Sequence, residues 1–390
     1  MKIILFDHPE SRRRLMPFTL TRPIAEIRLG IGTIHEKWKW ISGTTVRLFP
    51  SDLQNEDSCF VDSSVIPDDN FFSFIQNLHQ GEALISGDRF LAARTPNTDQ
   101  SAWKDLKTIE IQMPETVDRL WKIFQLNGRE IRRDFHRITK GRSSEMLNDP
   151  FTRIYNPADV FIEPGASVKA VIINAESGPV YLGKNSRVLE GAVIQGPFAL
   201  GEDSVISMSA VMRGDTSVGP YCRVGGEINN SVFFSHTNKA HHGFLGNSVV
   251  GSWCNLGAGT SSSNMKNNFK NIRLWDDWSN DFEDTALQFC GLMMGDYATA
   301  AINTSFNTAT WVGAGARVIG AEFPPTRIPH FVQGGSGGFK AISLQDITES
   351  VSRFFNLKKK EFSEFDKKLL AQAFALAAEL GNSGSSKLPE

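Results

Sequence analysis

The sequence predicts two unlike folds in one chain: an α/β region at the N-terminus and a parallel β-solenoid after it, followed by C-terminal helices. Three observations predict this. Short apolar runs typical of buried strands occur near the N-terminus, an aliphatic residue recurs at every sixth position in the centre, and two other segments repeat apolar residues at helical steps. With 390 residues, the chain is long enough for two or three domains.

Residues 1–105 are predicted to form short β/α units. Residues 3–6 and 83–85 are apolar strand candidates, and the second is followed by Gly87 and Asp88. A carboxylate at the carboxyl end of a strand is a common way to hold a cation such as Mg²⁺ in an open α/β sheet, so Asp88 is a candidate metal ligand. The alternative is an ordinary turn aspartate.

Residues 106–158 are predicted to connect the two folds. Within residues 115–140 the apolar side chains recur mostly at three- and four-residue steps, which is typical of a helix with one buried face. These side chains are Val117, Leu120, Trp121, Ile123, Phe124 and Ile131. The more polar residues 141–158 are expected to lead into the solenoid.

A hexad repeat predicts the solenoid over residues 159–333. The aliphatic positions include Leu182, Val188, Ile194, Leu200, Ile206, Met212, Val218 and Val224, and a small residue usually follows four places later. Period six is typical of a triangular β-solenoid in which each hexad makes one face. The phase breaks at 226–243 and 262–293 are predicted to be loops outside the prism, where insertions commonly gather on a binding face.

Residues 334–390 are predicted to form a glycine-rich flexible break at 334–338, helices within 343–380, and a disordered end at 381–390. The chain carries 41 Lys+Arg and 43 Asp+Glu, a balance that does not favour binding to nucleic acid or an anionic membrane. No apolar run has the roughly 18 residues of a membrane helix. The four cysteines are far apart, so a cytoplasmic location without disulfides is expected.

One segment of the solenoid resembles a known family. Residues 239–246 (KAHHGFLG), residues 255–260 (NLGAGT) and Asn264 resemble the acetyltransferase half of the bifunctional N-acetylglucosamine-1-phosphate uridyltransferase/glucosamine-1-phosphate acetyltransferase family. The hexads resemble the left-handed β-helix of hexapeptide-repeat acyltransferases. The whole chain resembles a divergent sugar nucleotidyltransferase subgroup of this family. The resemblance implies a homotrimer with active sites between subunits.

The resemblance also implies N-acetyl transfer from acetyl-CoA to an amino sugar phosphate, with a histidine as general base. Keeping the Phe-Leu-Gly in register selects His241, and Glu227 lies fourteen residues before it, as a Glu does in the family. Aligning from Lys-Ala instead selects His242. The alternative is that the adjacent histidines belong to an ordinary polar loop.

Further roles follow from the same alignment. The residues implied for the sugar and its phosphate are Lys239, Lys270, Arg213, Glu227, Asn255 and Asn264, whereas Asn229 stands where the family has a phosphate-binding lysine. A stacked asparagine ladder at solenoid corners is the alternative for Asn255 and Asn264. The residues implied near the reactive end of acetyl-CoA are Ala258, Gly295 and Asp296.

The N-terminal region resembles sugar-phosphate nucleotidyltransferases at residues 14–19 (RLMPFT) and at Arg22, but Glu10 stands in place of the family's loop glycines. The residues implied for nucleotide binding are Arg14, Arg22 and Arg28. The alternative is structural ion pairing with nearby carboxylates. Two further hypotheses therefore stand beside acetyl transfer: a nucleotidyltransferase with a structural or regulatory β-helix, and a non-enzymatic sugar-nucleotide-binding scaffold.

Overall fold

The computed structural model describes residues 2–50 and 57–381. Its contacts divide the chain into two compact units that interleave along the sequence. The first comprises residues 1–15, 22–27 and 32–120, and the second comprises residues 16–21, 28–31 and 121–390. The sequence analysis predicts consecutive domains instead, because local patterns do not reveal that short N-terminal segments pack with the later unit.

The first unit is built on a six-stranded sheet of order β4-β1-β5-β7-β6-β8. Its strands are β1 (Lys2–Phe6), β4 (Val46–Leu48), β5 (Ser58–Asp62), β6 (Glu82–Ser86), β7 (Arg89–Arg94) and β8 (Lys107–Glu110). β1 is parallel to β4 and β5, whereas β7 is antiparallel to β5 and β6. The predicted α/β class and the strands predicted at 3–6 and 83–85 are therefore confirmed.

Short helices complete this unit: α1 (Pro9–Arg14), α2 (Ile34–Ser42) and α3 (Asp69–Asn77), with 3-10 turns η2 (Ile24–Glu26) and η3 (Gln100–Asp105). Thr33 and Glu36 form a reciprocal capping box that fixes the start of α2. Side chains from β1, β5, β6, β7 and η3 share one core, which comprises Ile4, Phe6, Phe60, Ala83, Ala93 and Trp103. This core holds β1 and β5 side by side, so their carboxyl ends meet at one edge of the sheet.

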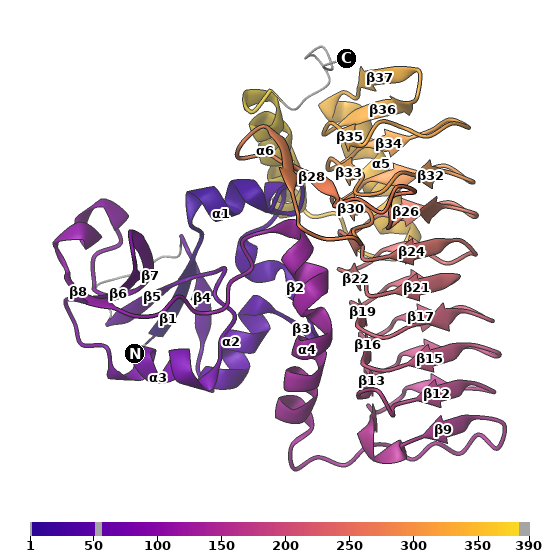
Figure 1. Ribbon diagram of the computed structural model, residues 1–390, viewed down its shortest axis with the longest axis horizontal. Coiled ribbons are helices and arrows are strands. Elements are labelled where there is room, and N and C mark those ends of the chain that lie inside the picture. The colour runs from indigo at the N-terminus through magenta and orange to yellow at the C-terminus, as the bar shows by residue number, and fades with distance from the viewer. Residues whose placement is uncertain (1, 51–56, 382–390) are drawn as a thin grey trace. The chain divides into compact units, whose positions relative to one another are not determined.

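The second unit is a left-handed parallel β-helix, as the sequence predicts. Figure 1 shows its strands as a regular ladder from β9 to β36. Sheet I contains β10 (Val160–Ile162), β13 (Val180–Leu182), β16 (Phe198–Leu200), β19 (Thr216–Val218), β22 (Val232–Phe233), β25 (Val249–Val250), β30 (Met293–Met294), β33 (Trp311–Val312) and β35 (Arg327–Ile328).

The other two faces follow the same order. Sheet II contains β11 (Ser167–Val168), β14 (Arg187–Val188), β17 (Val205–Ile206), β20 (Arg223–Val224), β23 (Asn238–Lys239), β26 (Asn255–Leu256), β31 (Thr299–Ala300), β34 (Arg317–Val318), β36 (Val332–Gly335) and β37 (Gly338–Ala341). Sheet III contains β9 (Arg153–Tyr155), β12 (Ile172–Asn174), β15 (Val193–Gln195), β18 (Val211–Met212), β21 (Glu227–Asn229) and β24 (Phe244–Gly246), and the pair β27 (Ser261–Ser262) and β32 (Ser305–Phe306) follows β24.

The hexad aliphatics point into the prism and form one continuous buried stack. Leu182, Leu200 and Val218 pair in register on sheet I, and Val188, Ile206 and Val224 do so on sheet II. Because every apolar face is buried against the coil above and below, stability comes mainly from contacts between neighbouring coils.

The first predicted phase break is not a loop. Val218 pairs with Phe233, fifteen residues on, whereas Leu200 pairs with Val218, eighteen residues on. Strands β21, β22 and β23 continue the sheets through this region, so the coil is shortened rather than interrupted. The second break is an insertion as predicted: residues 263–289 leave the prism and include the antiparallel hairpin of β28 (Arg273–Asp276) and β29 (Asp281–Asp284).

Two N-terminal segments and helix α4 (Leu120–Thr139) belong to this unit, and α4 lies within the predicted helical connector. The backbone N–H of Gly30, beside β2 (Arg28–Leu29), donates to the side chain of Asn127 on α4 at 2.8 Å. The indole N–H of Trp311 donates to the carbonyl of Met16 at 2.8 Å, just before η1 (Phe18–Leu20). These bonds attach both segments to the β-helix.

The predicted glycine-rich break at 334–338 is wrong, because these residues form the hairpin of β36 and β37. The helices predicted within 343–380 are confirmed as α5 (Leu344–Leu357) and α6 (Glu364–Glu379). The disordered end predicted at 381–390 lies, from residue 382, outside the described residues. No helix in the described ranges combines the length and apolar character needed to cross a membrane.

Candidate functional site

His241 and His242 lie at a corner of the β-helix, between β23 of sheet II and β24 of sheet III. Both side chains are exposed. The corner on the preceding coil consists only of Gly225 and Gly226, between β20 and β21. On the following coil, the N–H of Gly259 donates to the carbonyl of His242 at 3.1 Å. The histidine pair therefore projects from a corner that is hydrogen-bonded to the next coil.

Lys239 lies inside the prism rather than beside the histidines on the surface. It occupies the inward position of β23, paired with Val224 of β20, and its side chain is 0% exposed. Its ammonium donates to the carbonyls of His241 at 2.9 Å, His242 at 3.3 Å and Gly225 at 3.4 Å. Burial lowers the pKa of Lys239 from its ordinary 10.5 to about 8. Lys239 is thus turned away from any ligand outside the prism.

The corner that follows the histidines contains a half-buried residue, Ala258. The neighbouring N–H groups of Gly257, Gly259 and Thr260 donate to carbonyls, while the N–H of Ala258 has no acceptor within the described part of the chain. Imidazole is the side chain best suited to proton transfer near neutral pH. An imidazole and a backbone N–H on adjacent coils can therefore serve proton removal and oxyanion stabilisation.

The other implied sugar-binding residues are spread over two faces. Glu227 pairs with Arg213 on the adjacent strand (Oε1–Nη1 3.3 Å), and both are exposed. Asn264 donates to the side chain of Asn247 on the preceding coil at 2.8 Å. Asn255 lines a separate pocket of about 320 Å³ beneath α5. Lys270 is exposed in the insertion.

Gly295 and Asp296 do not face a donor site. Asp296 is 3% exposed, and its carboxylate accepts from the hydroxyl of Thr21 at 2.6 Å and from the N–H of Ser252 at 2.8 Å. A side chain added at Gly295 would meet Pro17 at 2.8 Å. The implied contact with acetyl-CoA is therefore wrong for these two residues, because the segment from Met16 to Thr21 covers them.

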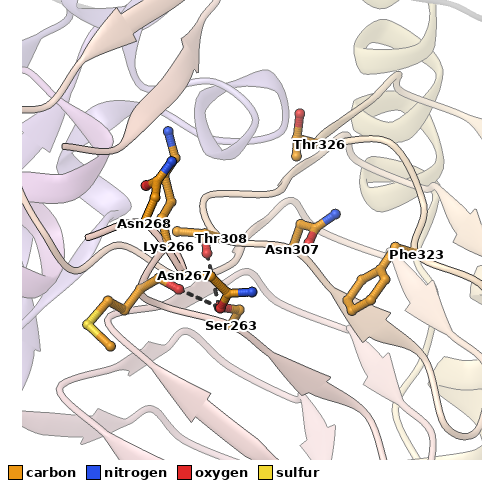
Figure 2. Close-up of a pocket in the computed structure, with 9 residues that line it drawn as sticks. Ser263, Lys266, Asn267, Asn268, Asn307, Thr308, Phe323 and Thr326 are labelled. Atoms are coloured by element: carbon orange, nitrogen blue, oxygen red, sulfur yellow. Dashed lines mark hydrogen bonds between the residues drawn. The ribbon is translucent and has the colours of Figure 1, made fainter. Parts of the chain in front are cut away.

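A polar pocket of about 520 Å³ lies where the insertion leaves the prism. Figure 2 shows its wall, in which the hydroxyls of Ser263 and Thr308 are hydrogen-bonded at 3.0 Å. Side-chain amides and hydroxyls dominate the lining: Ser263, Lys266, Asn267, Asn268, Asn307, Thr308 and Thr326, with Met265 and Phe323. The sequence analysis names none of these residues, although it predicts that this insertion gathers on a binding face.

The three arginines implied for nucleotide binding lie in different surroundings. Arg14 pairs with Glu10 along α1 (Nε–Oε1 2.7 Å), which is the structural alternative stated for it. Arg22 is half-buried. Burial raises the pKa of Glu26, but the hydrogen bond and charge of His35, followed by the charge of Arg22, outweigh burial and lower this pKa below its ordinary value. Arg28 belongs to the β-helix unit, where its guanidinium donates to the carbonyl of Ile31.

Asp88 lies in the exposed turn between β6 and β7. The carboxylates at the carboxyl ends of the parallel strands β1 and β5 are Asp7 and Asp62 instead. Asp62 is 0% exposed and accepts from the Arg89 guanidinium at 2.6 Å and 2.9 Å. Sequence reasoning missed Asp62, although it ends the apolar run 59–61 just as Asp88 follows 83–85.

These carboxylates do not fit a Mg²⁺ site. Arg89 neutralises Asp62, Arg12 pairs with Asp7 at 2.5 Å, and a cation would have to displace both guanidinium groups. Within residues 2–50 and 57–381, no three histidine, cysteine or acidic side chains converge as metal ligands. His8 adjoins this edge, and burial, followed by the charge of Arg89, lowers its pKa despite the opposing charges of Asp62 and Glu10.

Comparison with protein families gives one match. Residues 3–143 match the family model for sugar nucleotidyl transferase. The match covers little more than a third of the chain and includes β1, α1, Asp62 and Arg89, but none of the β-helix strands. The N-terminal region is therefore similar to sugar nucleotidyl transferases at the level of sequence.

Solved structures with similarity to the chain include the polySia-specific acetyltransferase NeuO (12% identity over 53% of this chain and 97% of that one, TM-score 0.29). They also include UDP-N-acetylglucosamine acyltransferases from Francisella novicida (14%, 61% and 90%, TM-score 0.23) and Bacteroides fragilis (12%, 62% and 100%, TM-score 0.28). TM-scores this low do not support transfer of function. No curated protein matches the chain.

Proposed function

We propose that the β-helix transfers an acetyl group from acetyl-CoA to the amine of an amino sugar phosphate, with His241 as general base. The observation that carries the proposal is that both histidine side chains are exposed while their backbone carbonyls accept hydrogen bonds from the buried ammonium of Lys239. Their corner of the β-helix presents an imidazole on a rigid element rather than on a free loop. His242 is the alternative base on the same corner.

In the proposed reaction, the amine nitrogen attacks the thioester carbonyl carbon and forms the new C–N bond. The carbonyl electrons move to oxygen, and the N–H of Ala258 stabilises the resulting oxyanion. The imidazole takes the proton that the amine loses. Collapse of the intermediate breaks the C–S bond, and the departing thiolate receives the proton from the imidazolium.

The pocket in Figure 2 supports a sugar-containing acceptor. Most of its residues follow β27 and β32, whereas the histidines precede β24 on the same face. At about 3.3 Å per residue along a strand and about 4.8 Å between strands, the pocket lies ~10–15 Å from the histidine corner. We therefore propose that it holds the part of the acceptor remote from the amine, with Lys266 and the amides as partners.

The test measures free thiol released from acetyl-CoA in the presence of glucosamine 1-phosphate. His241→Ala should lower kcat by about 10²–10⁴-fold, the usual contribution of a general base. His79→Ala is the matched control, because His79 is an exposed histidine of the other unit. Loss of thiol release in His242→Ala but not in His241→Ala would assign the role of general base to His242. Undiminished sugar-dependent release in both variants would refute the proposal.

A second candidate function is nucleotidyl transfer by the N-terminal unit, which the family match over residues 3–143 favours. In that reaction a phosphate oxygen of a sugar 1-phosphate attacks the α-phosphorus of a nucleoside triphosphate, and pyrophosphate leaves. Arg89, at the carboxyl edge of the sheet, is the cation best placed to meet a phosphate there.

Pyrophosphate release with glucosamine 1-phosphate or its N-acetylated form, tested with each of the four common nucleoside triphosphates, measures this second activity. Arg94→Met provides a matched loss of an arginine from the same unit, because Arg94 pairs with Asp57 at the opposite end of β5. Release that falls in Arg89→Met but not in Arg94→Met would support the assignment. Absence of release with every nucleotide would exclude it for these acceptors.

A further inference from the structure

We propose that Lys239 is a positioning residue that holds the His241–His242 corner from inside the β-helix, and not a ligand for the sugar phosphate. The inference deepens the proposed acetyl transfer and rests on it for its catalytic consequence. Its structural part, that one interior ammonium sets the backbone of this corner, stands on the geometry of the coil alone.

The coil lengths explain why a lysine is needed at this position. Four residues join the two strands at most corners on this edge, as between Ile206 of β17 and Val211 of β18, but β20 and β21 are joined by Gly225 and Gly226 alone. The regular corners fill the prism with a small inward residue such as Ala210 or Thr260, and the shortened corner has none. The Lys239 side chain extends from the aliphatic stack into this part of the prism.

The hydrogen bonds match the chemistry of an ammonium. Its three N–H donors meet three carbonyls, those of Gly225, His241 and His242. Two of these carbonyls belong to the candidate base and its neighbour. The third belongs to the shortened corner on the preceding coil, so one side chain joins the two coils.

No carboxylate within residues 2–50 and 57–381 forms an ion pair with this buried ammonium. Desolvation is the one cause of its lowered pKa, and the charged side chains on the adjoining strands, Arg223 and Glu227, are exposed outside the prism. The imidazoles of His241 and His242 are exposed as well. A buried, unpaired ammonium is costly to keep, so the carbonyl contacts must offset its desolvation.

The same geometry excludes a phosphate-binding role. A phosphate outside the prism would have to draw the ammonium through the corner and break all three hydrogen bonds. The lysine position expected from the family alignment is therefore occupied by a side chain that acts on the backbone of the histidines.

Lys239→Met tests the proposal. Methionine fits the prism, since Met212 and Met294 already occupy inward positions. It removes the ammonium donor from the carbonyls of Gly225 and His241, and it leaves the carbonyl of His242 with the N–H of Gly259 alone. Lys184→Met is the matched control, because Lys184 is an exposed lysine of the same β-helix. The first readout is the NMR spectrum of histidine labelled in the ring, assigned with His241→Ala and His242→Ala.

The expected result is a shift of the His241 and His242 resonances in Lys239→Met, with the resonances of His35 and His330 unchanged, and no shift in Lys184→Met. In the acetyl-transfer assay, kcat should fall tenfold or more while KM for the sugar phosphate stays within about twofold. A raised KM with unchanged kcat and histidine resonances would overturn the proposal in favour of phosphate binding.

The two readouts separate the inference from the proposed function. If no acetyl transfer is found with the unmodified protein, the histidine resonances still decide whether Lys239 holds the corner. If the resonances of His241 and His242 do not move in a folded Lys239→Met, the inference is wrong even where the enzyme is active. Where Lys239→Met fails to fold, Lys239→Arg and Lys239→Gln retain donors and are measured in the same way.

Discussion

Single residues carry unusual charges in both units. Lys239 is a cation inside an apolar prism, and Asp62 is an anion with 0% exposure that Arg89 neutralises. Neither stands out in the sequence. Lys239 falls in a segment that resembles a ligand-binding motif, and Asp62 ends an ordinary buried strand. Their surroundings depend on burial. Burial in turn depends on coil lengths and strand order, which cannot be predicted from a single residue.

The buried Lys239 predicts how stability varies with pH. In the unfolded chain its pKa is the ordinary 10.5, and in the folded protein it is about 8. Between these values the unfolded state binds the extra proton, so the free energy of unfolding should rise with pH, by up to about 1.4 kcal/mol per pH unit. Below about pH 8 both states are protonated and this contribution is constant.

Urea unfolding of the protein and of Lys239→Met, measured from pH 7.5 to 10, checks the prediction. Other groups titrate in this range in both proteins, so the difference between the two curves isolates Lys239. The free energy of unfolding of the unmodified protein, minus that of Lys239→Met, should increase as the pH rises. Parallel curves would show that Lys239 keeps its ordinary pKa in the folded state.

At the scale of elements, an aromatic stack joins α5 to the β-helix. Trp253 stacks between His236, with ring centroids 4.1 Å apart, and Phe355 of α5 at 3.7 Å. Tyr221 continues the stack below His236 at 4.7 Å. Burial lowers the pKa of His236 to about 4, with Lys358 and Lys360 contributing, so the imidazole within the stack is neutral at physiological pH.

Trp253→Ala should loosen α5 and uncover His236. Loss of a buried tryptophan costs about 3–5 kcal/mol where the site cannot collapse. Hydrogen exchange should therefore speed up selectively in residues 344–357, and an NMR titration should show the pKa of His236 rising toward its ordinary 6.5. Phe365→Ala, which removes an exposed aromatic from α6, is the control and should alter neither.

The sequence predicted most elements of the β-helix because its signal is periodic. Hexads from Leu182 to Val224 were enough to indicate three faces and an inward aliphatic stack. The predicted loop at 226–243 was wrong because a shortened corner and an external loop both interrupt the six-residue period. The role implied for Asp296 was also wrong, because its partner Thr21 is 275 residues away. The polar pocket was missed because its residues come from separate coils.

At the scale of the molecule, the β-helix is not complete without segments from the N-terminal end of the chain. Thr21 binds Asp296, Met16 binds Trp311, and the hydroxyl of Ser217 donates to the carbonyl of Gly30 at 2.7 Å. Phe18 is fully buried against Phe234. The expected homotrimer stays a prediction, to be checked by light scattering of the full chain.

A chain of residues 121–390 should therefore be less stable than the full chain. It loses the hydrogen bond from the Thr21 hydroxyl to the carboxylate of Asp296 and the packing of Phe18 on Phe234. A hydrogen bond to a charged group contributes about 1.5–3 kcal/mol. A synthetic peptide of residues 16–31 should bind this fragment and raise its melting temperature, whereas a scrambled peptide should not. The arrangement would be contradicted by a fragment that has the same melting temperature as the full chain and does not bind the peptide.

The bond between Met16 and Trp311 spans 295 residues of sequence. At 5–20 residues per second, a ribosome needs about 15–60 s to add those residues. For that time the surface that binds the segment around Phe18 and Leu20 is incomplete, because it includes both Phe234 and Trp311. Newly made chains thus carry an unshielded apolar segment through most of translation. The last coils of the β-helix, and not the first, determine when the N-terminal end becomes protected from aggregation and proteolysis.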